Sequence, residues 1–201
     1  MTSIIIPSSI KEIGTGAFES CLSLEKIIIQ SSIHTIKYNL FKNCINLSQI
    51  IIPSSVTIID DCAFENCAIE SIELPLSLES INKCAFQGCK KLKSIKLPKS
   101  LKSIGENAFL DCIELKEIII QSSIDSIGAK AFSCCTSLQS ICIPSSLTVI
   151  EKDTFSCCSS LVEIEIPSSV TYIGANAFSY CSSLTQLTIP PSVTSIAPNA
   201  F

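Results

Sequence analysis

The sequence predicts a right-handed solenoid of about nine coils, an α/β fold in which strand predominates, with a parallel sheet on the concave face. Two observations carry this prediction. The nine phenylalanines recur every 23 residues, except for one interval of 22 between Phe64 and Phe86. A cysteine stands three residues after each of the first eight phenylalanines, from Cys21 to Cys181. A fixed period in the twenties is typical of chains in which each repeat stacks on its neighbour.

Each repeat contains a short aliphatic strand. Leu161, Ile164 and Ile166 stand six, nine and eleven residues after Phe155, and the other repeats have Leu or Ile at the matching positions. This alternation is typical of a strand with one buried face. Proline usually follows, and it ends the strand because it has no N–H to donate to a sheet. The 22-residue interval between Phe64 and Phe86 reflects one residue deleted just after Cys67, so we expect a loop there.

A serine occupies the turn after this strand in every repeat. We expect its hydroxyl to bond the backbone of its own coil or the next, as a buried turn requires. A second alternating stretch, exemplified by Val170 and Ile173, predicts an outer strand. The Ala-Phe-x-x-Cys segment is too short for more than one helical or 3₁₀ turn. The serines are Ser9, Ser32, Ser55, Ser77, Ser100, Ser123, Ser146, Ser169 and Ser192.

The stretch Leu-x-x-Ile-x-Ile-x-x-Ser matches the leucine-rich-repeat pattern, with Ser in place of the usual Asn. The full repeat, I-x-I-P-x-S-V-x-x-I-G-x-x-A-F-x-x-C-x-x-L, resembles the BspA-like leucine-rich repeat over essentially all 201 residues. That resemblance implies an adhesin-like surface protein of the kind found in host-associated bacteria and mucosal protozoa. Only Gly14, Gly105, Gly128 and Gly174 supply the glycine of the pattern, so a left-handed backbone is not expected there.

Composition excludes several classes of function. Apolar residues make up 47% of the chain, charged residues 16%, and the net charge is −4, which disfavours disorder and gives no basic surface for nucleic acid. No apolar run approaches the roughly 20 residues that cross a bilayer. The N-terminal stretch "MTSIIIPSSIKEIG" lacks the basic region of a signal peptide. We therefore expect no nucleic-acid partner and no membrane span, while the cell surface is implied only by the resemblance.

The thirteen cysteines fall into two sets. Eight form the column that follows phenylalanine and predict a reduced, inward-facing cysteine ladder. The same rotamer repeated in every coil does not give the dihedral of a disulfide, although the coil spacing permits one. The other five are Cys62, Cys84, Cys134, Cys142 and Cys157. Cys62 and Cys84 occupy the same position in consecutive repeats, as do Cys134 and Cys157, so each pair could oxidise to a disulfide. A metal is disfavoured because zinc requires four converging ligands.

Catalytic residues are scarce. His34 is the one histidine, at a position that is Thr in several other repeats, which fits a surface substitution. No Ser–His–Asp or Cys–His pairing and no phosphate-binding loop follows from the spacing. The doublet Asp60–Asp61 fits a solvated turn. We expect no catalytic site, no cofactor and no enzyme.

The outward positions of the strand vary, and such a strip is the usual recognition surface of repeat proteins. This predicts a protein- or extracellular-matrix-binding module, adhesin-like by the resemblance. The alternative is an intracellular scaffold that binds other proteins through the concave face, favoured by the missing signal and the unpaired cysteines. Ile5, Ile28 and Ile51 share one outward column and predict an apolar ribbon bordered by Lys26 and Gln49. A rimmed apolar patch often marks an interaction site, although β-branched residues also favour strands in general.

One solenoid is expected over residues 1–201, without separate domains. A strand begins within two residues of Met1, and Phe201 falls halfway through a repeat. Solenoids need polar caps because the last coil otherwise exposes core side chains. We expect a fragment of a longer array, or end-to-end self-association through the uncapped termini.

Overall fold

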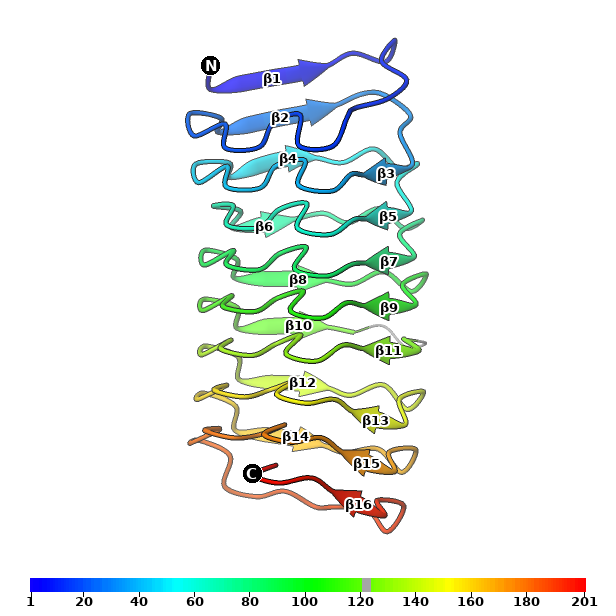
Figure 1. The fold of residues 1–201 in the computed structure, drawn as a ribbon, viewed down its shortest axis with the longest axis vertical. Coiled ribbons are helices and arrows are strands. Elements are labelled where there is room, and N and C mark those ends of the chain that lie inside the picture. Colours follow the sequence, from blue (N-terminus) through cyan, green and yellow to red (C-terminus); the bar gives the residue numbers. More distant parts are fainter. Residues whose placement is uncertain (121–123) are drawn as a thin grey trace.

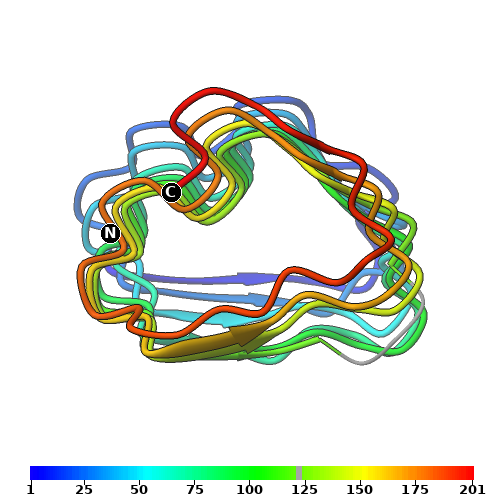
Figure 2. The ribbon, with the colours of Figure 1, turned by 90° about the horizontal axis from the view of Figure 1, so that it is seen from below.

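The computed structural model describes residues 1–120 and 124–201, and these residues wind into a stack of parallel coils (Figure 1). Seen along the stack, successive coils follow nearly the same outline (Figure 2). Each complete coil carries a strand of two to four residues on one side, a two-residue strand on the next side, and turns on the third. The described residues include no helix, and so none that could cross a membrane.

The longer strands form the long-strand face. Every pairing on it is parallel and joins strands one repeat apart. Its strands are β1 (Ser3–Ile6), β2 (Lys26–Ile29), β4 (Gln49–Ile51), β6 (Ser71–Ile72), β8 (Ser94–Lys96), β10 (Glu117–Ile119), β12 (Ser140–Cys142) and β14 (Glu163–Glu165).

The two-residue strands form the short-strand face, also parallel. They are β3 (Thr35–Ile36), β5 (Ile58–Ile59), β7 (Ser80–Ile81), β9 (Ser103–Ile104), β11 (Ser126–Ile127), β13 (Val149–Ile150), β15 (Tyr172–Ile173) and β16 (Ser195–Ile196). The predicted solenoid and its second, outer strand are confirmed. The strands make about eight coils rather than nine, because Ile13 in the first repeat and residues 186–188 in the last form no strand.

In the described part of the chain, strand pairing is interrupted once on each face. On the long-strand face β4 does not pair with β6, and on the short-strand face β11 does not pair with β13. The first interruption coincides with the one-residue deletion after Cys67, which shortens the chain that leads into β6. Register is regained at the next pair, where Ser71 and Ser94 are partners. The deletion therefore lies in a loop, as predicted, and also costs the sheet one set of hydrogen bonds.

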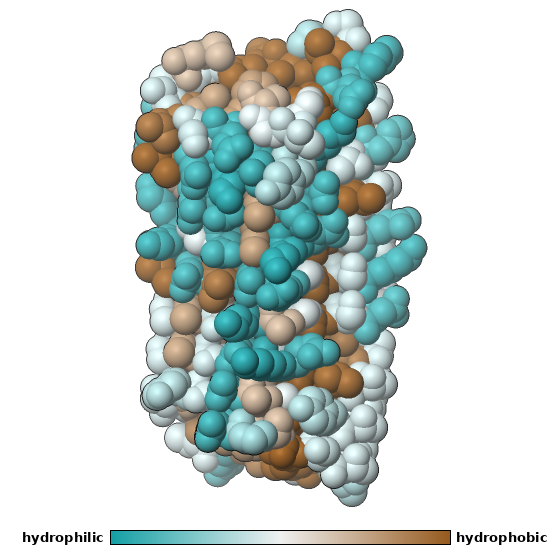
Figure 3. Space-filling view, in the orientation of Figure 1, coloured by the Kyte–Doolittle hydropathy of each residue, from teal (hydrophilic) through white to brown (hydrophobic). Residues whose placement is uncertain are grey.

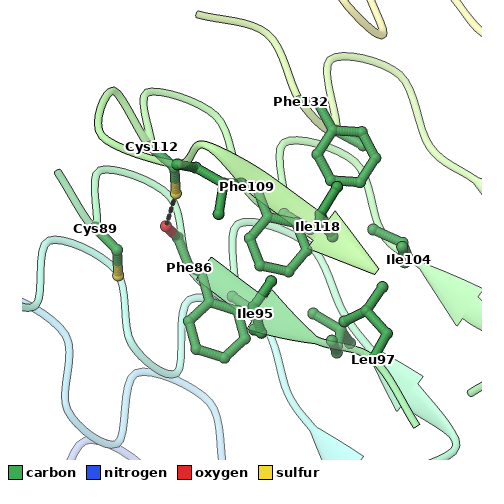
Figure 4. Close-up of a cluster of buried hydrophobic side chains, with 14 of the residues drawn as sticks. Phe86, Cys89, Ile95, Leu97, Ile104, Phe109, Cys112, Ile118 and Phe132 are labelled. Atoms are coloured by element: carbon green, nitrogen blue, oxygen red, sulfur yellow. Dashed lines mark hydrogen bonds between the residues drawn. The ribbon is translucent and has the colours of Figure 1, made fainter. Parts of the chain in front are cut away.

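Stacked phenylalanines run through the core (Figure 4). Successive rings lie nearly parallel, and the Phe86–Phe109 pair has centroids 5.3 Å apart at an interplanar angle of 2°. Both rings are fully buried. Centroid separations in this range belong to offset stacking, which contributes beyond the area that each ring buries. One coil spacing thus matches one ring spacing.

The cysteine ladder lies beside the phenylalanines. The thiol of Cys112 donates to the Phe86 carbonyl of the preceding coil at 3.2 Å, and the same bond recurs from coil to coil (Figure 4). Six cysteines of the column are buried, and the ladder members Cys21 and Cys181, in coils near the ends, are half-buried. The column packs inward, as predicted, and its thiols also satisfy backbone carbonyls.

The Phe segment is a run of consecutive turns, in keeping with the prediction that it is too short for more than one helical or 3₁₀ turn. In one coil, the Glu19 N–H closes a turn to the Gly16 carbonyl, while the Phe18 N–H donates to Leu40 of the next coil. Residues two before and two after phenylalanine adopt positive φ, as at Asn39 (54°) and Asn43 (60°). Left-handed residues reverse the chain at each turn, and this allows alternate N–H groups to point to the neighbouring coil.

The serine turn forms the predicted hydrogen bond in five coils. The hydroxyls of five serines donate at 2.6 Å to a carbonyl of the preceding coil: Ser55, Ser77, Ser100, Ser146 and Ser169. Ser123 lies outside the described residues. Within the described residues, Ser9 and Ser32 do not form this bond, and the hydroxyl of Ser192 is buried without a partner.

Apolar side chains reach the surface at the ends of the stack, where brown gathers in Figure 3. The Phe201 ring is 54% exposed although it stacks on Phe178. Ile10 in the first coil is 38% exposed. End-to-end self-association and membership of a longer array stay predictions.

Replacing Ser100 by Ala should lower the free energy of unfolding by about 1–3 kcal/mol, because the part-buried Leu78 carbonyl loses its hydroxyl donor. The matched control is Ser192→Ala, which removes a buried hydroxyl that has no partner. That variant should be neutral or stabilising in urea melts. Equal costs at the two positions would contradict a hydrogen-bonded serine ladder.

Replacing Gly105 by Ala should destabilise the chain by about 1–3 kcal/mol through overpacking. A Cβ there would lie 2.5 Å from the Asn82 carbonyl carbon of the preceding coil, and φ is not positive, so close approach rather than backbone conformation favours glycine. Gly14 has nothing within 4 Å of the same Cβ, and Gly14→Ala should leave the melting temperature nearly unchanged. A melt in which both variants behave alike would rule out this explanation.

Candidate functional site

The residues predicted to bind a partner lie together on the first three strands of the long-strand face. The register places Ile5 beside Ile28 and Ile28 beside Ile51, in consecutive strands. Ile5 is 58% exposed and Ile51 is 55% exposed, while Ile28 is half-buried. Lys26 and Gln49 are direct partners two residues earlier on β2 and β4. The five side chains therefore make one surface, named here the isoleucine ribbon.

A shallow groove of about 280 Å³ borders this ribbon at the interruption between β4 and β6. Lys26, Gln49 and Ile51 line it from one side, and Ser71 and Glu73 line it from the other. The repeat pattern alone does not predict this groove. Its signal in the sequence is the missing residue after Cys67.

Core side chains are less completely covered beside the groove. Ile50 is only partly buried, whereas its equivalents Ile27 and Ile95 are 0% and 3% exposed. Beside the lost strand pairing, Ile50 is partly exposed and lines the groove. The groove floor is therefore apolar.

Charged groups frame the groove. Among the described residues, neither Lys26 nor Glu73 has an ion-pair partner. Glu70, just before β6, is bonded to Lys93 at 2.8 Å, and this hydrogen bond lowers the pKa of Glu70. Both side chains of that pair are exposed, so solvent screens the interaction. Lys26 and Glu73 stay available to a partner.

The remaining long-strand face is more polar. Glu73 and Lys96 interrupt the isoleucine column, and Ile119 restores a single apolar side chain that is 43% exposed. A wider hollow of about 1000 Å³ lies over β12 and β14, with Glu163 and Glu165 on its lining. Residues 186–188 form the outer edge of this hollow and make no strand, which leaves the hollow open on that side. The two glutamates make its lining acidic.

The acidic doublet Asp60–Asp61 and the single histidine, His34, occupy turn and surface positions. Asp60 accepts bonds from the Asn82 side chain and the Asp61 N–H, and Asp61 accepts from the Lys83 N–H. The doublet thus stabilises a turn. His34 is exposed, and its carbonyl accepts the Thr57 N–H at 2.8 Å. In residues 1–120 and 124–201, no three or more His, Cys, Asp or Glu side chains converge as a metal site would require.

Burial governs the chemistry of the ladder thiols. It raises the pKa of Cys44 to about 11 and that of Cys89 to about 12. The pKa of Cys112 is raised well above its usual range for the same reason. Because the thiolate is the reactive form, burial disfavours reaction of these cysteines at neutral pH, and we expect them to have a structural role.

The extra cysteines of the turns occupy left-handed positions that the sequence analysis did not identify. Cys62 and Cys84 precede phenylalanine by two residues, and each has a φ of 55°. Cys134 and Cys157 follow it by two, with φ of 58° and 61°. Asn, Asp or Gly fills most other coils at these positions, in keeping with the tolerance of these residues for positive φ.

Comparison with known proteins gives a consistent picture. A family model described as the BspA type leucine rich repeat region matches residues 1–93 and 79–201. None of the curated proteins is significantly similar to the chain. A leucine-rich-repeat protein of T. pallidum is 28% identical with a TM-score of 0.67, covering 92% of this chain and 78% of its own. A leucine-rich-repeat protein of Bacteroides ovatus is 29% identical with a TM-score of 0.53. The match covers 100% of this chain and 76% of that protein. A leucine-rich cell surface protein of Faecalibacterium prausnitzii shares the fold, at 24% identity and a TM-score of 0.59. The match covers 93% of this chain and 78% of that protein.

Brief alkylation of the native, reduced chain should modify Cys142 first, because it is the exposed cysteine. Cys89 and Cys112 should react only after unfolding, since burial suppresses their thiolates. Peptide mass spectrometry over a time course measures the order. Modification of Cys89 at the rate of Cys142 in the folded chain would show that the ladder is not buried.

Proposed function

Because the chain belongs to the BspA-type leucine-rich-repeat family, we propose that it is a binding module that captures a protein or extracellular-matrix ligand on its long-strand face. The role is adhesin-like, with no catalytic activity of its own. The observation that carries the proposal is the isoleucine ribbon with its adjoining groove: Ile5, Ile28 and Ile51 stand outward in register beside an apolar floor.

The ribbon has the composition of a binding surface. Exposed apolar side chains that adjoin one another are uncommon on a monomer surface unless they serve an interaction. The rigid stack beneath holds them in place, so a partner loses little free energy to ordering this side of the interface. Lys26 and Glu73 at the rim lack ion-pair partners in the described part of the chain and give the site polarity at its edges. The ligand is therefore expected to present an apolar strip with polar flanks.

The test is site-specific photo-crosslinking from position 49, which lies in the groove and is exposed. The chain is incubated separately with an extracellular-matrix protein extract and a cytosolic extract, and crosslinked partners are identified by mass spectrometry. Ile28→Ser together with Ile51→Ser should reduce the crosslink at least tenfold, because each buried isoleucine contributes about 1.5–3 kcal/mol to the contact. A partner from the matrix extract supports the adhesin-like role, and a partner from the cytosolic extract alone supports the scaffold alternative.

The matched control is Leu22→Ser with Ile45→Ser. These two side chains are 52% and 53% exposed, in the same coils as Ile28 and Ile51, but outside the long-strand face. Melting curves of both double variants establish that the coils stay folded. An unchanged crosslink in the ribbon variant, or an equal loss in the control, would contradict the proposal.

A further inference from the structure

The sequence Phe-Ser-Cys-Cys occurs twice in consecutive repeats, at 132–135 and 155–158. The second cysteine of each motif belongs to the buried ladder. The first, Cys134 or Cys157, is a left-handed residue outside the ladder column and is half-buried. The function proposed above uses neither of them.

Backbone hydrogen bonds hold these two cysteines in adjacent coils. The Cys134 N–H donates to the Ser156 carbonyl, and the Cys157 N–H donates to the Ser179 carbonyl, each at 2.8 Å. Neighbouring hydrogen-bonded segments lie about 4.8 Å apart, within the Cα separation that a disulfide spans. Burial raises the pKa of the Cys134 thiol and the neighbouring Cys157 thiol raises it further, as expected of two thiols that lie close together.

Each thiol also has a hydroxyl beside it. The Ser133 Oγ lies 3.8 Å from the Cys134 Sγ, and the Ser156 Oγ lies 3.7 Å from the Cys157 Sγ. Both serines are largely buried. A hydroxyl at this distance can donate to a thiolate and stabilise the reactive form. The site therefore combines two adjacent thiols with two donors.

The place of the pair in the fold is also specific. Cys134 follows β11 and Cys157 follows β13, the two neighbouring short strands that do not pair. Cys62 and Cys84 follow β5 and β7, which do pair, and their coils are already joined on that face. A covalent link between 134 and 157 would join the coils where the short-strand face lacks hydrogen bonds.

We propose that Cys134 and Cys157 form a dithiol site that a small-molecule disulfide, such as oxidised glutathione, converts to a disulfide between adjacent coils. One protein thiolate attacks a glutathione sulfur, which forms a mixed disulfide and releases one glutathione thiolate. The second protein thiolate attacks the cysteine sulfur of that mixed disulfide and releases the other glutathione. The two protein thiols lose two electrons, which reduce the glutathione disulfide, and their protons pass to solvent or to the departing thiolates.

Two alternatives fit the site less well. A structural zinc ion needs four ligands, and the described residues contain no group of three. A disulfide between Cys134 and Cys135 is disfavoured because the Cys135 thiol is buried and bonded to the Phe109 carbonyl at 3.2 Å. The cross-coil pair is the accessible combination.

The experiment equilibrates the full reduced chain in glutathione buffers of increasing oxidation, blocks the remaining thiols by alkylation, and maps every cysteine by peptide mass spectrometry. The expected result is one cross-coil disulfide, Cys134–Cys157, with the loss of one thiol pair per chain. Cys62 and Cys84 serve as the internal control. They share a column in adjacent coils but have no neighbouring serine. Burial raises the pKa of Cys62 to about 12; burial also raises the pKa of Cys134, but there the hydrogen bond with Ser133 opposes the shift. They should stay reduced at the same ratio.

Three further measurements separate this site from a structural role. Cys134→Asn should fold, because Asn43 and Asn66 occupy the same left-handed column, and it should form no cross-coil disulfide. Ser133→Ala should slow disulfide formation without preventing folding. Oxidation should increase amide-exchange protection at Ile127 on β11 and Ile150 on β13, the neighbouring short strands that do not pair with each other.

Several outcomes would overturn the proposal. The proposal is wrong if the Cys134–Cys157 disulfide does not form under conditions that oxidise the exposed Cys142. It is also wrong if the disulfide links two chains, or if Cys62 and Cys84 oxidise as readily as Cys134 and Cys157. An unchanged oxidation rate in Ser133→Ala would remove the activating role of the hydroxyl.

Discussion

Backbone hydrogen bonds between coils hold each coil one strand spacing from the next, and every other feature depends on this spacing. A side chain in one coil meets its own equivalent above and below, so only types that stack on themselves can occupy the interior. Phenylalanine rings do so at centroid separations of 5.2 to 5.8 Å. Cysteine and serine do so by donating to a carbonyl of the coil before. The columns of the sequence are the consequence of this one repeated distance.

Periodic residues made the fold predictable from sequence. The phenylalanine interval gave the solenoid, and the invariant serine gave a backbone hydrogen bond that Ser100 and its equivalents form. Left-handed turns were harder to identify, because the side chains there vary and Cys62 and Lys130 obscure a column otherwise rich in Asn. The glycine pattern also needed coordinates. Gly105 is favoured by close approach of Asn82, while Gly14 has open space.

The candidate site was predictable to the extent that register was. A constant repeat places Ile5, Ile28 and Ile51 in line, and the alternation of the strand sends them outward. The groove beside them was not predictable, because it depends on whether a shortened loop still lets β6 reach the hydrogen-bonding distance of β4. A deletion in the sequence gives the position of such a change. It does not say whether the strands separate or the loop absorbs the difference.

The two interruptions in strand pairing lie on different faces and at different heights of the stack. Where β4 and β6 separate, β5 and β7 remain joined on the other face, and where β11 and β13 separate, β10 and β12 remain joined. A stack that is fastened on one side and open on another bends most easily at that level. Because the two interruptions lie on different faces, we expect bending at these two levels to occur in different directions. We expect bending at one level to widen the groove beside Ile51, and bending at the other to strain the turn that carries Cys134 and Cys157. Mechanical load along the stack would be felt first at these two places.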